Sequence, residues 1–249
     1  MSAIASRPLS PQARGAIAAW LYALLAHGLL SYVSGGQPGT LLDLLKPLWG
    51  ILPPSLRQLG TDHLRLLLRC TWAAVHVAVY VPLPWLLARL VGQRSADLGL
   101  QPADWTRVRL LFGIAAAVLL LIVLMFSTTR LFAGAYPMFR PSLPVSEAPA
   151  PWLVAMLAMA AHLLSVEFFF RGFLPAVSVP ALGRWGALAT LLPYVASHAF
   201  WPEAIGALPF GLFLLVLRER CGSLWPGYAL HLALALSLEG IALWRQGLL

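Results

Sequence analysis

Glu167 and Arg171 are the first residues of this chain whose types and spacing could support chemistry. They lie four positions apart in the run Ser165-Val-Glu-Phe-Phe-Phe-Arg-Gly172, which is otherwise apolar. On a helix, residues at this spacing share one face with Cβ atoms about 6 Å apart, so the carboxylate and the guanidinium can neutralise each other. An ionisable residue at the centre of a membrane helix costs roughly 2.5 to 3.5 kcal/mol, so the pair is a candidate functional site.

Two imidazoles in later apolar segments are of the type that would complete such a site. His198 lies near the end of the segment 185–200, and His231 lies early in the segment 224–244. Two histidines and a carboxylate can activate water as general bases, or they can hold a divalent metal such as zinc. The chain has neither a His-Glu-x-x-His sequence nor a dense Cys/His cluster. The spacing therefore leaves two alternatives open: no cofactor, or zinc bound by Glu167, His198 and His231.

Two further acids complete the candidate set, and each has an ordinary structural explanation beside the functional one. Glu203 follows His198 by five residues, just after the Trp201-Pro202 break, where an acid at a helix N terminus complements the helix dipole. Glu239 follows His231 by eight residues, which places it about 12 Å further along the same helix. A solvated helix end would explain Glu239 without any role in chemistry.

Three other histidines stand alone in apolar segments, namely His27, His76 and His162. For each of them a hydrogen bond within the core is the expected role. His162 is five residues before Glu167 and is therefore expected to point away from it.

The composition places these residues in a membrane. The chain has 249 residues, of which 60% are hydrophobic and only 10% are charged, and its mean hydropathy is +0.80. We therefore predict one integral membrane domain over residues 1–249, an all-α, polytopic transmembrane helix bundle. The basic residues behind the net charge of +8 are spread among apolar segments, which fits membrane topology and argues against nucleic-acid binding. Cys70 and Cys221 are far apart and imply neither a disulfide nor a metal site.

The hydropathy pattern predicts seven membrane spans, or eight if an uncertain segment is included. The predicted spans are 16–33, 69–92, 108–133, 150–173, 185–200, 204–218 and 224–244. The uncertain segment, 40–60, is amphipathic and broken by prolines, and we expect it to be interfacial or re-entrant. Between 185–200 and 204–218 the proline at position 202 cannot continue one straight helix, so the two segments are predicted to form a tight helical hairpin. The stretch from Ala133 to Pro151 is predicted to be an external loop that precedes the motif-bearing half, 150–249.

Three sequence motifs resemble those of a known family. They are Glu167-Phe-Phe-Phe-Arg-Gly-Phe-Leu174, Tyr194-Val-Ala-Ser-His198, and Arg218-Glu-Arg-Cys-Gly-Ser-Leu-Trp225 leading into His231. In this order they resemble the CAAX-protease and bacteriocin-processing (CPBP, Abi-like) family of intramembrane endopeptidases. The similarity covers about the last 100 residues, and the upstream run Ala96-Asp-Leu-Gly-Leu100 also resembles a segment of that family.

The resemblance implies hydrolysis of a peptide bond within the membrane. The family's motifs are Glu-Glu-x-x-x-Arg, an aromatic residue four before a histidine, and His-x-x-x-Asn. By position, His198 would help to activate water and His231 would face the oxyanion. Arg171 would hold Glu167, at the second-glutamate position, in its charged form.

The chain departs from the family pattern at two positions. Val166 stands where the family has its first glutamate, and Ala235 stands where it has the asparagine. Loss of a general base typically costs 10²- to 10⁴-fold in rate, and loss of an oxyanion donor costs about 10²- to 10³-fold. The chain resembles a variant layout of the family, in which Pro202, Glu203 and Glu239 have counterparts. In that layout Glu203 or Glu167 would supply the missing carboxylate.

We therefore expect an intramembrane endopeptidase that acts on a membrane-embedded or lipid-linked peptide or protein, in a multi-pass protein of the bacterial inner membrane. The alternative is a catalytically impaired relative that binds or chaperones membrane peptides, which Val166 and Ala235 suggest. A transporter or channel is a third alternative, although it would need polar residues along several spans, and the first three predicted spans contribute little beyond His27 and His76.

Overall fold

The computed structural model of the chain describes residues 10–34, 61–198 and 201–249. Within these ranges every regular element is a helix, which confirms the predicted all-α bundle. The segment 40–60 lies outside the described residues, so its interfacial or re-entrant placement stays a prediction.

The helices differ widely in length. In chain order they are α1 (Pro11–Ser34), α4 (Thr61–Tyr80), α5 (Pro82–Leu90), α6 (Trp105–Phe126), α7 (Arg130–Ala135), α8 (Pro149–Glu167), the π-helix η2 (Phe168–Phe173), α9 (Leu174–Leu182), α10 (Arg184–Ala189), α11 (Leu191–Ala196), α12 (Trp201–Cys221) and α13 (Trp225–Arg245).

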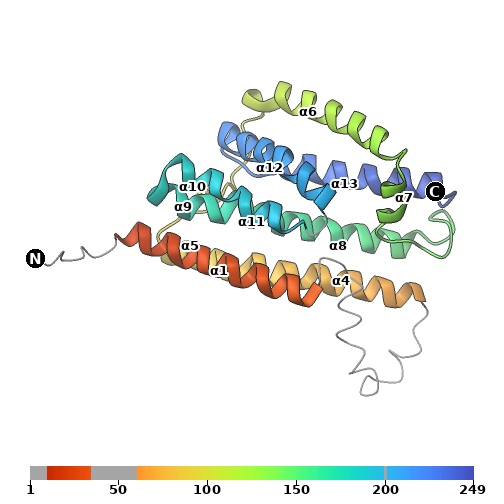
Figure 1. Cartoon of the computed structure of the whole chain (residues 1–249), viewed down its shortest axis with the longest axis horizontal. Helices are drawn as coiled ribbons and strands as arrows, with labels where there is room; N and C mark the ends of the chain where they lie inside the picture. Colours follow the sequence, from red (N-terminus) through yellow and green to blue (C-terminus); the bar gives the residue numbers. More distant parts are fainter. Residues whose placement is uncertain (1–9, 35–60, 199–200) are drawn as a thin grey trace, which may run out of the picture.

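The helices are stacked in layers, as Figure 1 shows. At the bottom of the view α1, α4 and α5 form one layer, with α4 packed along α8 and α1 packed along α9. The next layer contains α8 and α9 with the short helices α10 and α11, and α12 and α13 lie above it. Helix α13 also packs against α6, which runs along the outer edge. The helix that ends at Glu167 is therefore enclosed between layers on both sides.

Among the residues that the structure describes, five helical stretches are long and apolar enough to cross a membrane, which supports a multi-pass membrane protein. They are Pro11–Leu30, Asp62–Leu90, Trp105–Phe126, Pro149–Leu182 and Trp225–Arg245. Each overlaps a predicted span, and Pro149–Leu182 is longer than the predicted 150–173 because η2 and α9 continue α8.

The predicted span 185–200 is wrong as a single helix, because it contains two helices of six residues each, α10 and α11. Pro193 cannot donate a backbone hydrogen bond to the carbonyl of Ala189, and the helix breaks at Thr190 between them. Helix α12 begins at Trp201, where the sequence predicted a break, and it packs against α11 as one half of the predicted hairpin.

The predicted span 108–133 ends earlier than expected, at Phe126. Three hydroxyl groups after the helix take up its last carbonyls: Ser127 Oγ donates to Leu124, and Thr128 and Thr129 each donate to the carbonyl three residues before. These bonds satisfy the groups that a helix end leaves unpaired, so the chain can turn into α7.

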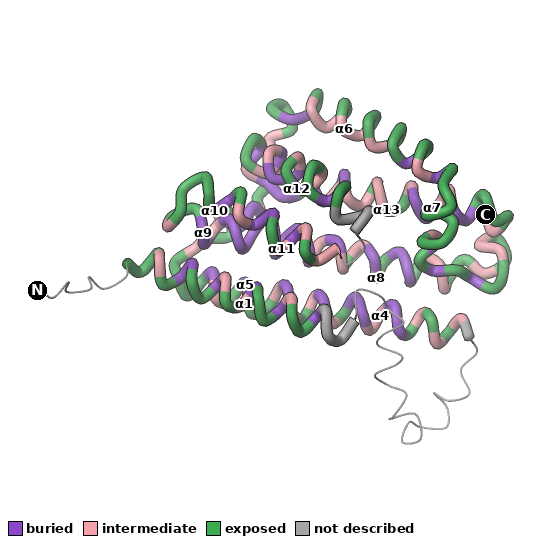
Figure 2. Tube along the Cα trace, in the orientation of Figure 1, coloured by how far each residue is buried: buried purple, intermediate pink, exposed green. Residues whose placement is uncertain are grey.

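Many residues of helix α6 are exposed, from one end of the helix to the other (Figure 2), and most of these residues are apolar. Leu110, Leu121 and Met125 are 75%, 59% and 66% exposed. Such a surface would be unfavourable in water and suits a helix that faces lipid.

The loop of residues 95–101, which precedes α6, is fastened to the turn between α12 and α13. Arg218 Nη2 donates to the backbone carbonyl of Asp97 at 2.7 Å, and the Leu224 amide donates to the carbonyl of Gly99 at 2.9 Å. These hydrogen bonds join two stretches that resemble family motifs, the upstream run Ala96–Leu100 and the third motif, Arg218–Trp225. They also fix the position at which α13 begins.

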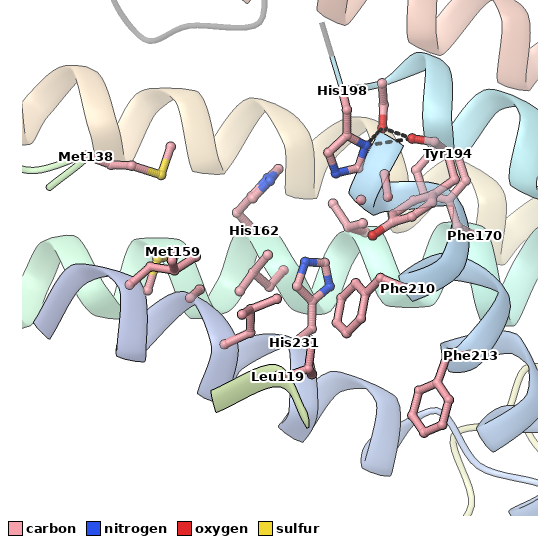
Figure 3. Close-up of a pocket in the computed structure, with 18 of the residues that line it drawn as sticks. Leu119, Met138, Met159, His162, Phe170, Tyr194, His198, Phe210, Phe213 and His231 are labelled. Atoms are coloured by element: carbon pink, nitrogen blue, oxygen red, sulfur yellow. Dashed lines mark hydrogen bonds between the residues drawn. The ribbon is translucent and has the colours of Figure 1, made fainter. Parts of the chain in front are cut away.

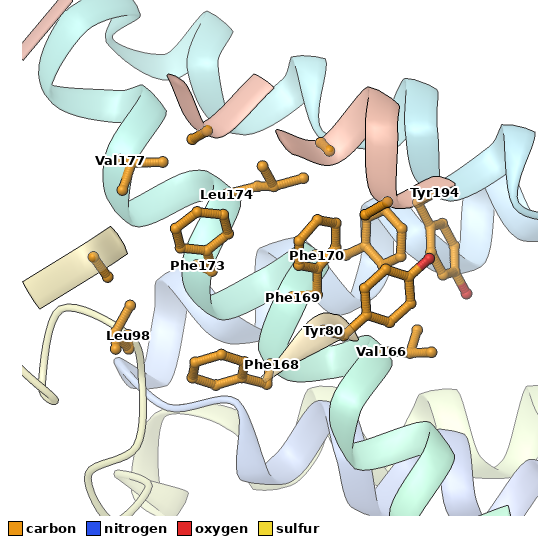
Figure 4. Close-up of a cluster of buried hydrophobic side chains, with 14 of the residues drawn as sticks. Tyr80, Leu98, Val166, Phe168, Phe169, Phe170, Phe173, Leu174, Val177 and Tyr194 are labelled. Carbon is orange, nitrogen blue, oxygen red and sulfur yellow. The ribbon is translucent and has the colours of Figure 1, made fainter. Parts of the chain in front are cut away.

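The aromatic run of the first motif forms the centre of the main hydrophobic core (Figure 4). The Phe169 ring stacks on Tyr80 with ring centroids 4.4 Å apart, and Phe170 meets Tyr194 edge to face at 5.5 Å. Large buried aromatic rings dominate core energetics. They therefore anchor Glu167 and Arg171, which flank them in sequence, between α4 and α11.

Candidate active site

Glu167 is the centre of a buried charged cluster at the end of α8. Its side chain is completely buried, and its Oε1 accepts a hydrogen bond from Nδ1 of His231 on α13 at 2.8 Å. The same oxygen lies 3.5 Å from Nη1 of Arg171. The expected contact between Glu167 and Arg171 is therefore present, and His231 is the third member of the cluster.

Arg171 is held from its other side by an aromatic ring. Its Cζ lies 3.7 Å from the centroid of the Tyr194 ring, and both side chains are buried. A desolvated cation over an aromatic face is worth about 2 kcal/mol or more. Gly211 of α12 backs the ring, since a Cβ at this position would lie 2.7 Å from Tyr194 ring carbons and 3.2 Å from Arg171 Nη2.

The π-helix η2 carries Arg171 and Gly172. π-helices are rare and occur mostly as single turns at functional sites. A Cβ on Gly172 would lie 2.7 Å from the carbonyl oxygen of Leu98, so only glycine allows the 95–101 loop to approach this turn. In the Arg-Gly pair of the motif, Arg171 thus supplies the positive charge that faces Glu167, and Gly172 lets the backbone of the 95–101 loop come close to η2.

His198 follows α11, and its orientation is set by that helix. Its Nδ1 lies 2.8 Å from the backbone carbonyl of Tyr194, and its ring meets the Tyr194 ring edge to face with centroids 4.8 Å apart. A carbonyl can only accept a hydrogen bond, so this contact assigns the proton to Nδ1 and leaves a lone pair on Nε2.

His198 and His231 line one cavity of about 910 Å³, into which both rings point (Figure 3). Its volume is in the upper part of the range of ligand pockets, about 300 to 1,000 Å³. Glu167 does not line this cavity and lies behind His231, so the carboxylate reaches it only through the imidazole. The cavity lining therefore does not include the carboxylate of Glu167, and its role in supplying the missing carboxylate stays a prediction.

The two positions at which the chain departs from the family pattern face this same cavity. Val166 and Ala235 both contribute to its lining. Their side chains carry neither the carboxylate nor the amide that the family has at these two positions. The cavity wall is apolar at the two places where the family has polar groups.

Glu203 and Glu239 have different outcomes. The side chain of Glu203 lies outside what the structure describes, so its auxiliary role stays a prediction. Glu239 is completely buried, and its Oε1 accepts a hydrogen bond from the Met138 amide at 2.7 Å. The interpretation of Glu239 as a solvated helix end is therefore wrong, because the loop after α7 folds over this end of α13.

The three histidines for which a core hydrogen bond was expected, His27, His76 and His162, also line the cavity. His76 Nδ1 lies 2.8 Å from the Trp72 carbonyl, which confirms the core hydrogen bond expected for it. His162 has no hydrogen-bond partner at its buried Nδ1, and its ring packs on Trp72 with centroids 4.0 Å apart.

Figure 3 shows that the His162 ring points into the pocket on the side of His198 and His231. The expectation of a core hydrogen bond is not met at Nδ1 of His162. His162 precedes Val166 by four residues, so the two share one face of α8. That spacing was the signal in the sequence, because a residue on the face of the family's first glutamate must face the site.

Hydrogen bonds within the chain engage one atom of each candidate zinc ligand, and the binding of a cofactor stays a prediction. Glu167 Oε1 is taken up by His231 Nδ1, and His198 Nδ1 is taken up by a carbonyl. Within the described ranges no three His, Cys, Asp or Glu side chains are grouped so that they could hold a metal ion. The arrangement fits instead a pair of imidazoles whose Nδ1 atoms are fixed by acceptors and whose Nε2 atoms are available to the cavity.

One comparison with known proteins gives a match. Residues 148–237 match the family model described as "Type II CAAX prenyl endopeptidase Rce1-like", just over a third of the chain. The matched region runs from the start of α8 into α13 and contains Glu167, Arg171, His198 and His231. No curated protein and no solved structure matches the chain.

Proposed function

We propose that this chain belongs to the CAAX-protease family of intramembrane endopeptidases, as the match over residues 148–237 indicates, and that it hydrolyses a peptide bond of a membrane-embedded or lipid-linked substrate in the cavity beside α8. The observation that carries the proposal is the contact between Glu167 and His231. A fully buried carboxylate holds one nitrogen of an imidazole whose ring faces a cavity, and a second oriented imidazole lines the same space.

In the proposed reaction His198 is the group that activates water. Its Nδ1 proton is engaged by the Tyr194 carbonyl, so Nε2 accepts a proton from a water molecule while the water oxygen attacks the scissile carbonyl carbon. The C–N bond of the resulting tetrahedral intermediate then breaks. The leaving nitrogen receives a proton from an imidazolium, and the products are a carboxylate and an amine.

Glu167 takes the role of a positioning residue for His231. It accepts the Nδ1 proton and so aims Nε2 at the cavity, in the way a buried carboxylate orients histidine in catalytic triads. The negative charge of Glu167 also balances the charge that His231 acquires when it carries a second proton. Arg171 keeps this carboxylate paired in a low-dielectric surrounding.

Tyr194 is the proposed substitute for the missing asparagine. Its hydroxyl is buried without a hydrogen-bond partner, and the residue lines the cavity between the two histidines (Figure 3). A hydroxyl that donates to the developing oxyanion would supply the contribution that Ala235 cannot make. We further propose that the reaction needs no metal, because within the described ranges no three His, Cys, Asp or Glu side chains are grouped so that they could hold one.

The test compares the peptides released from membranes that contain the full chain with those released by variants. We expect wild type to release peptides that are absent with His198→Ala and with His231→Gln, while both variants stay folded in the membrane. Treatment with 1,10-phenanthroline should leave the release unchanged, whereas a zinc enzyme would lose it. Unchanged release by His198→Ala would contradict the proposed reaction.

A second function is favoured by the apolar lining at two positions. Val166 and Ala235 would make the cavity a binding site for a membrane peptide without hydrolysis. A binding protein of this kind would retain the same peptides with wild type and with His231→Gln, and neither protein would release fragments. The same measurement therefore separates the two functions.

A further inference from the structure

A second charged group lies in the wall of the cavity, away from the cluster around Glu167. Arg69 of α4 is only 3% exposed and contributes to the lining. Its guanidinium lies over the Trp72 ring, with Cζ 5.1 Å from the centroid. Nη2 donates only to Met138 Sδ at 3.6 Å, a weak acceptor, while Nε and Nη1 have no hydrogen-bond partner.

An arginine in this state is costly. Its guanidinium stays protonated in proteins, and a charged residue within a membrane span is unfavourable unless it is paired. Within the described ranges no carboxylate lies in ion-pair contact with Arg69. By contrast Arg171, at the other charged position, is paired with Glu167.

An acidic side chain in the lining of the same cavity does not form an ion pair with Arg69. Glu239 lines the same cavity and is close enough for its charge to interact with that of Arg69. Its Oε1, however, is directed to the Met138 amide, and its Oε2 is buried without a partner. The two side chains thus face one space with open polar atoms and do not satisfy each other.

We propose that Arg69 is a binding subsite for a carboxylate of the peptide that occupies the cavity. This inference rests on the proposed function for the presence of a peptide. A carboxylate oxygen would replace the weak contact of Met138, whose flexible thioether can move aside, and it would bring the missing negative charge to a cation with several open N–H donors.

The distance along α13 between His231 and the Arg69 subsite is short enough for one bound peptide to reach both. Glu239 marks the Arg69 end and follows His231 by eight residues, which corresponds to about 12 Å of helix. A few residues of extended peptide, at about 3.3 Å each, cover this length. The carboxylate can belong to the chain terminus or to an acidic side chain of the bound segment.

The experiment measures binding, so that it does not depend on cleavage. Full-length protein in detergent micelles is titrated with a fluorescent apolar hexapeptide in three forms: a free C-terminal carboxylate, a C-terminal amide, and a C-terminal amide with one internal glutamate. We expect at least one carboxylate form to bind about ten- to a hundredfold more tightly than the plain amide, as for a hydrogen bond to a charged group. The form that gains affinity identifies the source of the carboxylate.

Variants on one helix provide the control. Arg69→Met should bind all three forms equally, Arg69→Lys should keep part of the preference, and Arg65→Met should keep all of it. Arg65 lies one turn earlier on α4, with a side chain 51% exposed beside Asp62. Because Arg69→Met removes an unpaired buried charge, its unfolding temperature should stay equal to or above that of wild type.

Each result decides between the proposals. A lower unfolding temperature for Arg69→Met, or a preference for carboxylates that survives in this variant, would overturn the subsite. Carboxylate-dependent binding without any release of fragments would support the subsite and contradict hydrolysis. If wild type bound none of the three forms, the subsite would be overturned, while the release of fragments would still decide on hydrolysis.

Discussion

The side chain of Tyr194 has two roles, one for its ring and one for its hydroxyl oxygen. Its ring supports the guanidinium of Arg171, while its hydroxyl has no partner and is proposed to meet the oxyanion. Replacement by phenylalanine keeps the ring and removes only the oxygen. The residue therefore offers a clean separation of structure from chemistry.

We predict that Tyr194→Phe lowers the rate of peptide release by about 10²- to 10³-fold, the usual cost of an oxyanion donor, with little change in thermal stability. Quantitative mass spectrometry of the released peptides, with the unfolding temperature measured in parallel, checks both parts. Release at the wild-type rate would remove Tyr194 from the reaction.

The Glu167 and Arg171 pair has a different signature, because each residue compensates a buried charge. Glu167→Gln should destabilise the protein by about 3 to 5 kcal/mol, since it leaves the buried Arg171 without its counter-ion. Adding Arg171→Met should restore much of the stability without restoring peptide release. Chemical denaturation in detergent measures the first effect.

The control for this series is Glu219→Gln, which changes an exposed glutamate of α12. It should alter neither the stability of the protein nor the release of peptides. Equal stability of wild type and Glu167→Gln would show that the carboxylate is not the counter-ion of Arg171.

At the residue scale, the sequence predicted which residues form the charged cluster better than it predicted which hydrogen bonds join them. The spacing of Glu167 and Arg171 indicated their contact, because four residues on a helix set that distance. Nothing in the spacing indicated that His231 would take the same carboxylate oxygen, since this contact depends on how α13 packs against α8. His162 was placed in the core for a similar reason, because its face was compared with Glu167 and not with Val166.

At the scale of elements, α12 is the helix that holds the cluster in place. Gly211 lets its backbone approach the Tyr194 ring. Gly211→Ala should cost roughly 1 to 3 kcal/mol through overpacking and should also reduce peptide release, because the ring beneath Arg171 must move.

Gly206 of the same helix is the matched control. A Cβ there meets nothing within 4 Å, so Gly206→Ala should be neutral or stabilise the helix by up to about 1 kcal/mol. A comparison of unfolding free energies checks the pair. Equal effects of the two substitutions would contradict the packing described for Gly211.

The helices themselves were predicted where hydropathy is continuous and missed where local chemistry breaks them. The span at 224–244 agrees with α13 (Trp225–Arg245) almost residue by residue. The breaks after Phe126 and at Thr190 depend on hydroxyl groups and on Pro193, which a hydropathy window does not weigh. The π-helix η2 depends on tertiary packing of its aromatic residues and has no pattern of its own.

At the scale of the whole molecule, the fold joins distant segments around one cavity. The 95–101 loop is bonded to the turn between α12 and α13 and also touches η2 through Gly172. Movement of this loop would therefore displace the start of α13 and, with it, His231.

Gly99→Ala tests this connection. Gly99 has φ +73°, and a Cβ on it would overlap Arg218 Nε, whereas Gly92 has φ +84° with open space around it. Both substitutions incur the backbone strain of about 1 to 2 kcal/mol, but only Gly99→Ala should also break the contact of Arg218 with the loop. We expect a larger loss of stability and of peptide release for Gly99→Ala than for Gly92→Ala, and similar losses would refute the connection.

Labelled water tests whether His198 and His231 take part in the hydrolysis of a peptide bond. Membranes with wild-type protein are incubated in H₂¹⁸O, and the released peptides are analysed by mass spectrometry beside those from the His198→Ala/His231→Gln double variant. The account predicts one ¹⁸O atom in the newly formed carboxylate of wild-type products and no such products from the double variant. Identical peptides from both membranes, labelled or not, would contradict it.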